Sequence, residues 1–197
     1  MKIKAVVEET AMFGENLRMT REYLCNAGKN EMRIFDTVEN IGFSTEQLML
    51  NYHFNFGYPF VSEHTKVESA TDTVLPQKDY MPKKGYEDFA VPTDGHPSLV
   101  YYHGVGESDD AFAEIINPEF PVMNGKVRMP VKVRLKWSSV DLPNMVHWKM
   151  PASGNYVLGI QPANCLVDGR VKEKENGTAI YLEPGRKMTY QLGLELE

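Results

Sequence analysis

The sequence predicts an all-β protein, an antiparallel β-sandwich or barrel-like sheet pair. The strongest observation is a period of two in residues 127–137, where apolar side chains alternate with polar or basic ones. Residues 188–196 repeat this pattern, which a strand produces because successive side chains point to opposite faces. No segment shows the 3.6-residue period of a long helix, and turns rich in glycine and proline separate the segments, as in sandwiches.

Each candidate strand has an apolar face and a bounding turn. Residues 17–23 and 32–38 alternate and flank a turn at residues 26–29. Residues 178–182 precede a type II turn at residues 183–186, so we expect a hairpin with the C-terminal strand. Pro130 cannot donate to a ladder, so we place it at a sheet edge or a bulge. Further strands are expected at residues 3–8, 48–56, 65–74, 98–105, 112–117 and 156–161.

Two segments do not fit the strand pattern. Residues 44–47 read as the cap of a single helical turn. Residues 75–97 contain four prolines and two glycines and are longer than an ordinary connection. We interpret this segment as a functional or covering loop, and not as a domain linker. The sequence therefore predicts one domain over residues 1–197.

The composition excludes several partners. The chain has 197 residues, of which 42% are hydrophobic and 24% charged, in the range of globular proteins. The net charge of -6 disfavours binding to nucleic acid or to an anionic membrane. We expect no signal peptide and no membrane anchor, since no apolar stretch approaches about 18 residues. Cys25 and Cys165 form no CxxC pair, which favours a reduced, cytoplasmic setting and leaves one long-range disulfide open.

The sequence also lacks the common catalytic motifs. It contains no GxSxG, no P-loop and no GxGxxG, so serine hydrolase, NTPase and Rossmann dehydrogenase functions have no support. The five histidines show neither HExxH nor HxH spacing. We therefore expect neither a metal ion nor a cofactor. A basic row in residues 128–136 indicates either an anion site or, more simply, a solvated strand face: Arg128, Lys132, Arg134 and Lys136.

Residues 51–59 are dense in polar groups. Asn51, His53 and Asn55 share one face of a strand, and aromatic side chains occupy the other face. Three hydrogen-bonding side chains on one face suit the recognition of a polyhydroxylated ligand. A solvent-exposed polar face with an ordinary histidine is the alternative.

Residues 155–165 form the second polar segment. Gln161 and Asn164 follow a buried strand at the point where it gives way to a loop, where polar side chains reach pockets. Amide capping of local turns is the alternative. Two further candidates lie on strands: Trp148, whose ring suits stacking on a sugar but also a core position, and His103.

Four stretches of the chain carry a family resemblance. Residues 36–42 (DTVENIG), 48–59 (LMLNYHFNFGYP), 154–165 (GNYVLGIQPANC) and 182–185 (LEPG) resemble the aldose 1-epimerase, or galactose mutarotase-like, superfamily. More narrowly, they are similar to a bacterial branch of aldose-1-epimerase-like proteins. The resemblance covers most of the chain. It implies a galactose mutarotase-like β-sandwich (the family's supersandwich) that corresponds to the C-terminal half and lacks the N-terminal part.

The resemblance implies an isomerase chemistry. Mutarotases interconvert the α and β anomers of an aldose with a base and an acid on either side of one sugar ring. His53 matches the acid, and Gln161 stands at the position of the base, where the family has a glutamate. An amide cannot take up a proton at useful pH, although it can orient a hydroxyl. Either another carboxylate replaces this base, with Glu173, Glu175 and Glu183 as candidates, or the protein binds sugar without turning it over.

The implied pocket and partners follow from the same resemblance. A small-molecule sugar is the expected ligand, in a pocket lined by Asn51, Asn55, Trp148 and Asn164, with His103 as a further candidate. Family members carry an N-terminal half with more strands, a second histidine and an arginine, whereas this chain begins near the family's midpoint. We therefore expect a homodimer or a partner chain that covers the unpaired edge and the apolar face.

Three hypotheses on function are compatible with the sequence. The first is a carbohydrate-binding, mutarotase-like protein with aldose 1-epimerase activity. The second is a non-catalytic sugar-sensing or structural β-sandwich that has lost the base. The third is sugar-phosphate isomerase chemistry, in which the basic row of residues 128–136 meets a phosphate, provided that it faces the pocket.

Overall fold

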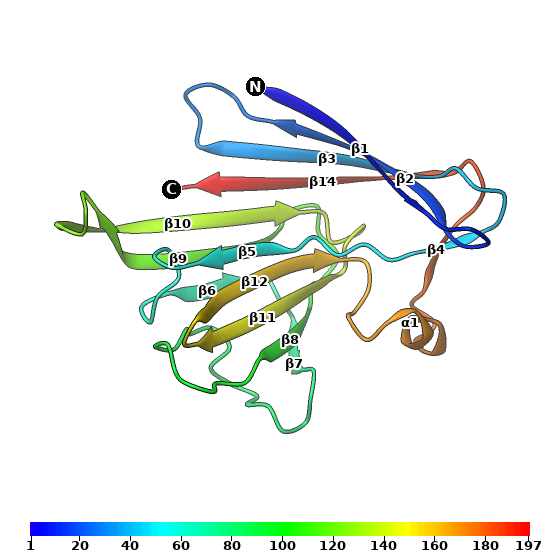
Figure 1. The fold of residues 1–197 in the computed structure, drawn as a ribbon. Helices are drawn as coiled ribbons and strands as arrows, with labels where there is room; N and C mark the ends of the chain where they lie inside the picture. The colour runs from blue at the N-terminus through cyan, green and yellow to red at the C-terminus, as the bar shows by residue number, and fades with distance from the viewer.

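The computed structural model describes residues 1–197 and consists of antiparallel β-sheets with one short helix (Figure 1). The larger sheet has seven strands in the order β1 (Lys2–Thr10), β2 (Asn16–Leu24), β3 (Glu31–Asn40), β14 (Lys187–Leu196), β10 (Val127–Trp137), β9 (Ala111–Val122) and β6 (Lys66–Ser69). The smaller sheet has five strands in the order β5 (Phe54–Gly57), β12 (Asn155–Ala163), β11 (Asn144–Ala152), β8 (Leu99–Gly104) and β7 (Thr73–Pro76). A two-stranded sheet joins β13 (Ile180–Leu182) to β4 (Glu46–Leu48).

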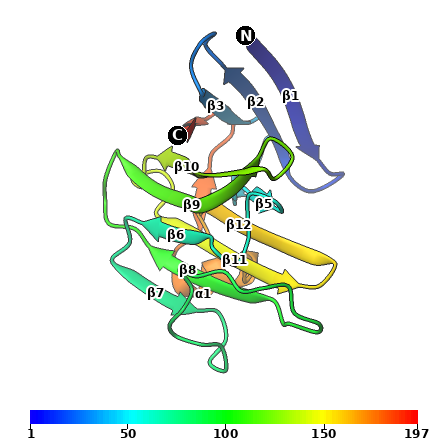
Figure 2. The same cartoon turned by 90° about the vertical axis from the view of Figure 1, so that its left-hand side faces the viewer.

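The two large sheets share one hydrophobic core. Alternate side chains of β3, β14, β10 and β9 are buried in it, and Leu158 and Ile160 of β12 meet them from the smaller sheet. Burial of one face of each sheet is what period-two patterning predicts. The predicted antiparallel sandwich is therefore confirmed. Figures 1 and 2 show β1 and β2 at the end of the molecule opposite to β7.

The structure explains the bend in the best-patterned strand. Between Met129 and Val131 the pairing of β10 with β9 shifts its register, which confirms the bulge predicted at Pro130. Pairing with β14 begins only at Val133, so the nitrogen of Pro130 faces no partner strand. The basic row points away from the core, and Lys132, Arg134 and Lys136 form ion pairs with Glu114, Glu195 and Glu197.

Several expected elements differ from the structure. The prediction that residues 178–182 form a hairpin with the C-terminal strand is wrong. Strand β13 pairs with β4, and β14 lies between β3 and β10. Residues 48–56 and 65–74 each break into shorter strands, and residues 44–47 form no helical turn. The turn at residues 183–186 is present, with Gly185 at a φ of 73°.

The sequence did not predict the helix α1 (Arg170–Asn176). Its seven residues are too few for an apolar period to be visible, and glycines flank it on both sides. Gly177 adopts a left-handed conformation, which ends the helix. No helix of the structure has the length and the apolar composition needed to cross a membrane.

The long segment after β7 covers the inner face of the smaller sheet, in agreement with the interpretation as a covering loop. Phe89 enters the core, and the buried Lys149 of β11 donates hydrogen bonds to the carbonyls of Gly85 and Asp88. Beneath the loop, His103 and His147 lie with ring centroids 5.4 Å apart. Both rings are almost fully buried, and none of their nitrogens has a hydrogen-bond partner.

A buried ionic group links the larger sheet to the segment before β5. Asp36 of β3 is 2% exposed and accepts hydrogen bonds from Arg21 of β2, at 2.6 Å from Nη2, and from the hydroxyl of Tyr52, at 2.7 Å. The hydrogen-bonded carboxylate raises the pKa of Arg21, and burial raises the pKa of Tyr52. The guanidinium therefore stays charged and the phenol stays protonated at neutral pH, as these bonds require.

Replacing Asp36 by asparagine should lower the free energy of unfolding by about 3 kcal/mol, because the Arg21 guanidinium loses its counter-charge in a half-buried position. Tyr52→Phe removes one hydrogen bond and should cost only about 1 kcal/mol. Urea denaturation of both variants measures the difference. Equal losses would contradict the ionic origin of the effect.

Mild acid should destabilise the fold through the buried histidines. Burial lowers the pKa of His103 to about 4 and that of His147 well below its usual value, whereas both groups titrate near 6.5 when unfolded. As the pH falls below about 6.5, the two histidines become protonated in the unfolded chain but stay neutral in the folded chain. Each histidine then lowers the free energy of unfolding by about 1.4 kcal/mol per pH unit. Urea midpoints between pH 7 and 5 test this, and His103→Leu should flatten the slope; a slope unchanged by that substitution would contradict it.

Candidate functional site

Side chains of the segment that leads into β5 alternate between the inner and the outer face of the smaller sheet. Tyr52 points inward to Asp36 and is 4% exposed, and Phe54 packs against the core. His53 and Asn55 point outward and are exposed to solvent. This alternation follows from the two-residue period of extended backbone, so the inward position of Tyr52 fixes the outward position of His53.

Strand β12 lies beside β5 and alternates in the same way. Leu158 and Ile160 face the core, so Gly159 and Gln161 face outward. Gly159 is paired with Asn55 of β5 on one side and with Trp148 of β11 on the other. Side chains from three adjacent strands therefore meet on the outer face of the smaller sheet.

Gly159 is the point on which these side chains converge. A methyl group at its Cα would lie 3.1 Å from Cε1 of His53, 3.1 Å from Nε2 of Gln161 and 3.2 Å from Cε3 of Trp148. Cε1 of His53 and Nε2 of Gln161 each lie 3.1 Å from this one point, so the distance between these two atoms is at most twice 3.1 Å. The absence of a side chain at residue 159 provides the space in which the three groups meet.

The tryptophan is held in a defined orientation. Its indole Nε1 donates a hydrogen bond of 2.7 Å to Oγ of Ser98, and its ring meets that of His53 edge-on with centroids 5.7 Å apart. The sequence did not single out Ser98. Tyr102 and Asp168 were also missed: the pairing of Tyr102 with Val146 places its side chain on this outer face, where its hydroxyl donates to Asp168 at 3.0 Å. A polar side chain in the middle of a strand was the only signal available for Tyr102.

Asn51 contacts Gln161 directly. Its Nδ2 donates a hydrogen bond of 2.9 Å to Oε1 of Gln161, while its own Oδ1 is buried without a partner. Asn51 also forms an isolated bridge with Ala163, so its backbone is tied to β12. The amide of Gln161 is 3% exposed, which places this pair at the base of the outer face rather than on its surface.

Two of the predicted pocket residues lie elsewhere. His103 is on the inner face of β8, under the covering loop, and the structure does not bring it to His53. Asn164 is buried and bonds to backbone: its Oδ1 accepts from the N–H of Leu50 at 2.7 Å, and its Nδ2 donates to the carbonyl of Leu48 at 3.2 Å. Asn164 thus ties the end of β12 to the segment that carries His53.

The three carboxylates considered as substitutes for a base are engaged elsewhere. Glu173 is buried and accepts hydrogen bonds from the N–H of Leu166 and from the hydroxyl of Thr178. Glu175 pairs with Lys172 on the surface of α1, and Glu183 accepts a hydrogen bond from Thr45. None of them bonds to His53 or Gln161. The histidines, cysteines and acidic residues form no group of three that could hold a metal ion.

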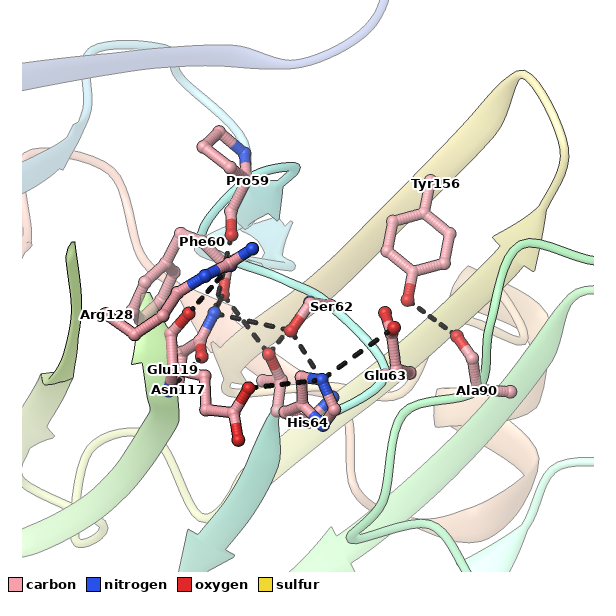
Figure 3. Close-up of polar contacts among 11 residues, drawn as sticks. Pro59, Phe60, Ser62, Glu63, His64, Ala90, Asn117, Glu119, Arg128 and Tyr156 are labelled. Atoms are coloured by element: carbon pink, nitrogen blue, oxygen red, sulfur yellow. Dashed lines mark hydrogen bonds and ion pairs between the residues drawn. The ribbon is translucent and has the colours of Figure 1, made fainter. Parts of the chain in front are cut away.

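A second polar cluster anchors the chain after β5 (Figure 3). The buried Asn117 of β9 donates to the carbonyl of Phe60 at 2.8 Å. His64 lies on the surface of this cluster, 3.6 Å from a carboxylate oxygen of Glu119 and 3.8 Å from one of Glu63. Exposed pairs of this kind contribute little to stability. The hydrogen bond from Asn117 to Phe60 thus holds the chain after β5, while the bond from Tyr52 to Asp36 holds the chain before it.

The candidate residues lie on an open face. A hollow of about 800 Å³ runs along β3, β14 and β10 of the larger sheet, and none of the predicted site residues lines it. The groups around Gly159 are an imidazole, a carboxamide and an indole on one face of a single sheet, and the carboxamide among them is buried.

Comparison with known proteins assigns the chain to a family. Residues 1–196 match the model of a family described as a domain of unknown function (DUF4432). The chain belongs to this family. Among curated proteins, none matches the chain.

Solved structures show the same fold. A Klebsiella pneumoniae subsp. pneumoniae MGH 78578 protein, described as a "putative aldose 1-epimerase", has a TM-score of 0.84 and 19% identity over 99% of this chain and 50% of its own. An Escherichia coli K12 protein of the same description has a TM-score of 0.69 and 15% identity, over 100% and 65%. A galactose mutarotase-like protein from Clostridium acetobutylicum has a TM-score of 0.63 and 16% identity, over 100% and 62%. The DUF4432 chain thus has a galactose mutarotase-like fold and spans about half to two thirds of these proteins.

A methyl group at residue 159 should disturb the site without unfolding the DUF4432 chain. In Gly159→Ala the exposed imidazole of His53 can move away, so we expect a stability loss of about 1 kcal/mol. The indole resonance of Trp148 and the ring resonances of His53 should shift in NMR spectra. Gly193→Ala is the control, since its nearest contact would be Cβ of Lys136 at an ordinary 3.8 Å. Unchanged His53 and Trp148 resonances in Gly159→Ala would refute the convergence.

Proposed function

We propose that this DUF4432 protein binds a small-molecule sugar of the aldose type on the outer face of its smaller sheet. The observation that supports this proposal is the convergence of His53, Gln161 and Trp148 on Gly159. An indole offers an apolar surface to the C–H face of a pyranose, while an imidazole and an amide hydrogen-bond to its hydroxyls. Solved structures of the same fold are described as a "putative aldose 1-epimerase" and a galactose mutarotase-like protein, which supports the same class of ligand.

The finer proposal is interconversion of α and β anomers. Ring opening requires a proton at the ring oxygen and removal of the proton from the C1 hydroxyl. His53 is exposed, and histidine is the side chain that most often serves as a general acid, so it is the proposed acid. Gln161 would hold the anomeric hydroxyl, Asn55 would extend the polar surface, and water would accept the hydroxyl proton. Without a carboxylate at residue 161 we expect only slow turnover.

One observation favours a second candidate function, sugar binding without catalysis. The group beside His53 is a neutral amide, and Glu173, Glu175 and Glu183 bond elsewhere. Since general base catalysis typically contributes about 10²–10⁴-fold, its loss would leave a sensor or a structural protein on the same scaffold. The basic row faces outward from the larger sheet and pairs with glutamates, which gives sugar-phosphate chemistry no support.

We further propose that a partner covers part of this chain, either a second copy or another protein. All nine residues of the edge strand β1 are exposed, including the apolar Ile3, Val6 and Val7. An exposed edge with apolar side chains favours association. The cytoplasmic setting and the bacterial source remain predictions.

NMR exchange spectroscopy between anomers tests the activity over a panel of hexoses and their phosphates. His53→Ala should abolish any acceleration, and Gln161→Glu should raise it at least about tenfold, because a carboxylate restores a base. His96→Ala, at a partly exposed histidine of the covering loop, is the matched control and should leave the rate unchanged. Ligand-induced thermal shifts without turnover would establish the sensor instead. Neither a shift nor turnover with any sugar would refute the proposed function.

A further inference from the structure

We infer that Asn51 is a positioning residue, which holds the side chain at residue 161 against His53 and supplies the N–H that a carboxylate at that position would need. This inference rests on the proposed function of the same site. It changes the role predicted for Asn51, from a group that touches the sugar to one that acts through its neighbour.

The contacts of Asn51 define this role. Its Nδ2 lies 2.9 Å from Oε1 of Gln161, and both side chains come from adjacent backbone, since Asn51 bridges Ala163 at the end of β12. Asn164 fixes the preceding residue by accepting the N–H of Leu50. Asn51 is thus held on both sides, and the direction of its amide is set by the backbone.

The pairing decides which atom of Gln161 faces the ligand. Because Oε1 is occupied by Asn51, Nε2 is the atom directed toward Gly159, the point that Cε1 of His53 also approaches. Gln161 therefore offers a donor, which a sugar can meet only with an oxygen lone pair. In this chain the amide binds a ring or hydroxyl oxygen and accepts no hydroxyl proton.

The same pairing suits a carboxylate. The side chain at residue 161 is 3% exposed, and burial alone would raise the pKa of a carboxyl group there and keep it protonated. A hydrogen bond donated by Asn51 stabilises the charged form and opposes this effect. Asn51 thereby keeps the position able to carry a base, and one substitution, Gln161→Glu, restores it.

NMR titration of the carboxyl carbon introduced by Gln161→Glu tests the inference without any measure of activity. We expect the pKa of this carboxyl to rise by at least about one unit when Asn51→Leu is added to Gln161→Glu, because the donor is lost. Asn51→Asp should raise it further, since a like charge then faces the introduced carboxylate. Asn155→Leu, an exposed asparagine at the other end of β12, should leave it unchanged. An equal pKa in Gln161→Glu and in all three double variants would overturn the inference.

A second measurement covers the case in which Gln161→Glu does not fold. In the natural chain, the side-chain amide protons of Gln161 should exchange with solvent at least about tenfold faster in Asn51→Leu than in Asn155→Leu, because the bond that holds the amide is lost. Equal exchange would overturn the role of Asn51. A failure of the proposed function would look different. The pKa of the carboxyl introduced at residue 161 would still depend on Asn51, but no sugar would shift the melting temperature of the protein and no sugar anomers would interconvert faster.

Discussion

The position of the candidate site depends on one buried carboxylate. Asp36 is closed off from solvent and neutralised by Arg21, and its second contact is the hydroxyl of Tyr52. Tyr52 also belongs to the hydrophobic core, so turning it outward would expose its buried ring as well as break this hydrogen bond. Since side chains alternate along extended backbone, a slip of one residue would bury His53 and expose Tyr52. The larger sheet thus determines which face of the smaller sheet carries the imidazole.

The smaller sheet separates two kinds of polar chemistry. Its outer face gathers His53, Gln161 and Trp148 around the missing side chain of Gly159. Its inner face buries His103 and His147, whose pKa values are lowered by desolvation. A buried imidazole that stays neutral has no proton to donate, so this inner pair is unsuited to acid catalysis at neutral pH. The inner histidines are therefore structural, whereas His53, on the outer face, is exposed to solvent.

The sequence predicted what depends on local patterning. Alternation located β10, β14, β2 and β3, and proline chemistry located the bulge at Pro130. It could not predict that β13 pairs with β4, because register between distant strands is set by tertiary packing. At the site, the pattern identified His53 and Gln161 but not Ser98, whose relevance comes only from its contact with Trp148. Asn164 bonds to the backbone of Leu48 and Leu50, which are distant in the sequence, so its amide caps no local turn and instead ties the end of β12 to the segment before β5.

The candidate site lies at the margin of the smaller sheet. Strand β5 is the edge strand of the smaller sheet, and the segment just before it contacts Arg21 of β2 through Asp36 and Tyr52. The free edge of β5 therefore lies toward β1 and β2, whose strands extend beyond the smaller sheet (Figure 1). His53 stands just before this edge strand, so the imidazole lies at the margin of the smaller sheet and not at its centre. The margin of an open sheet leaves backbone groups without a partner strand.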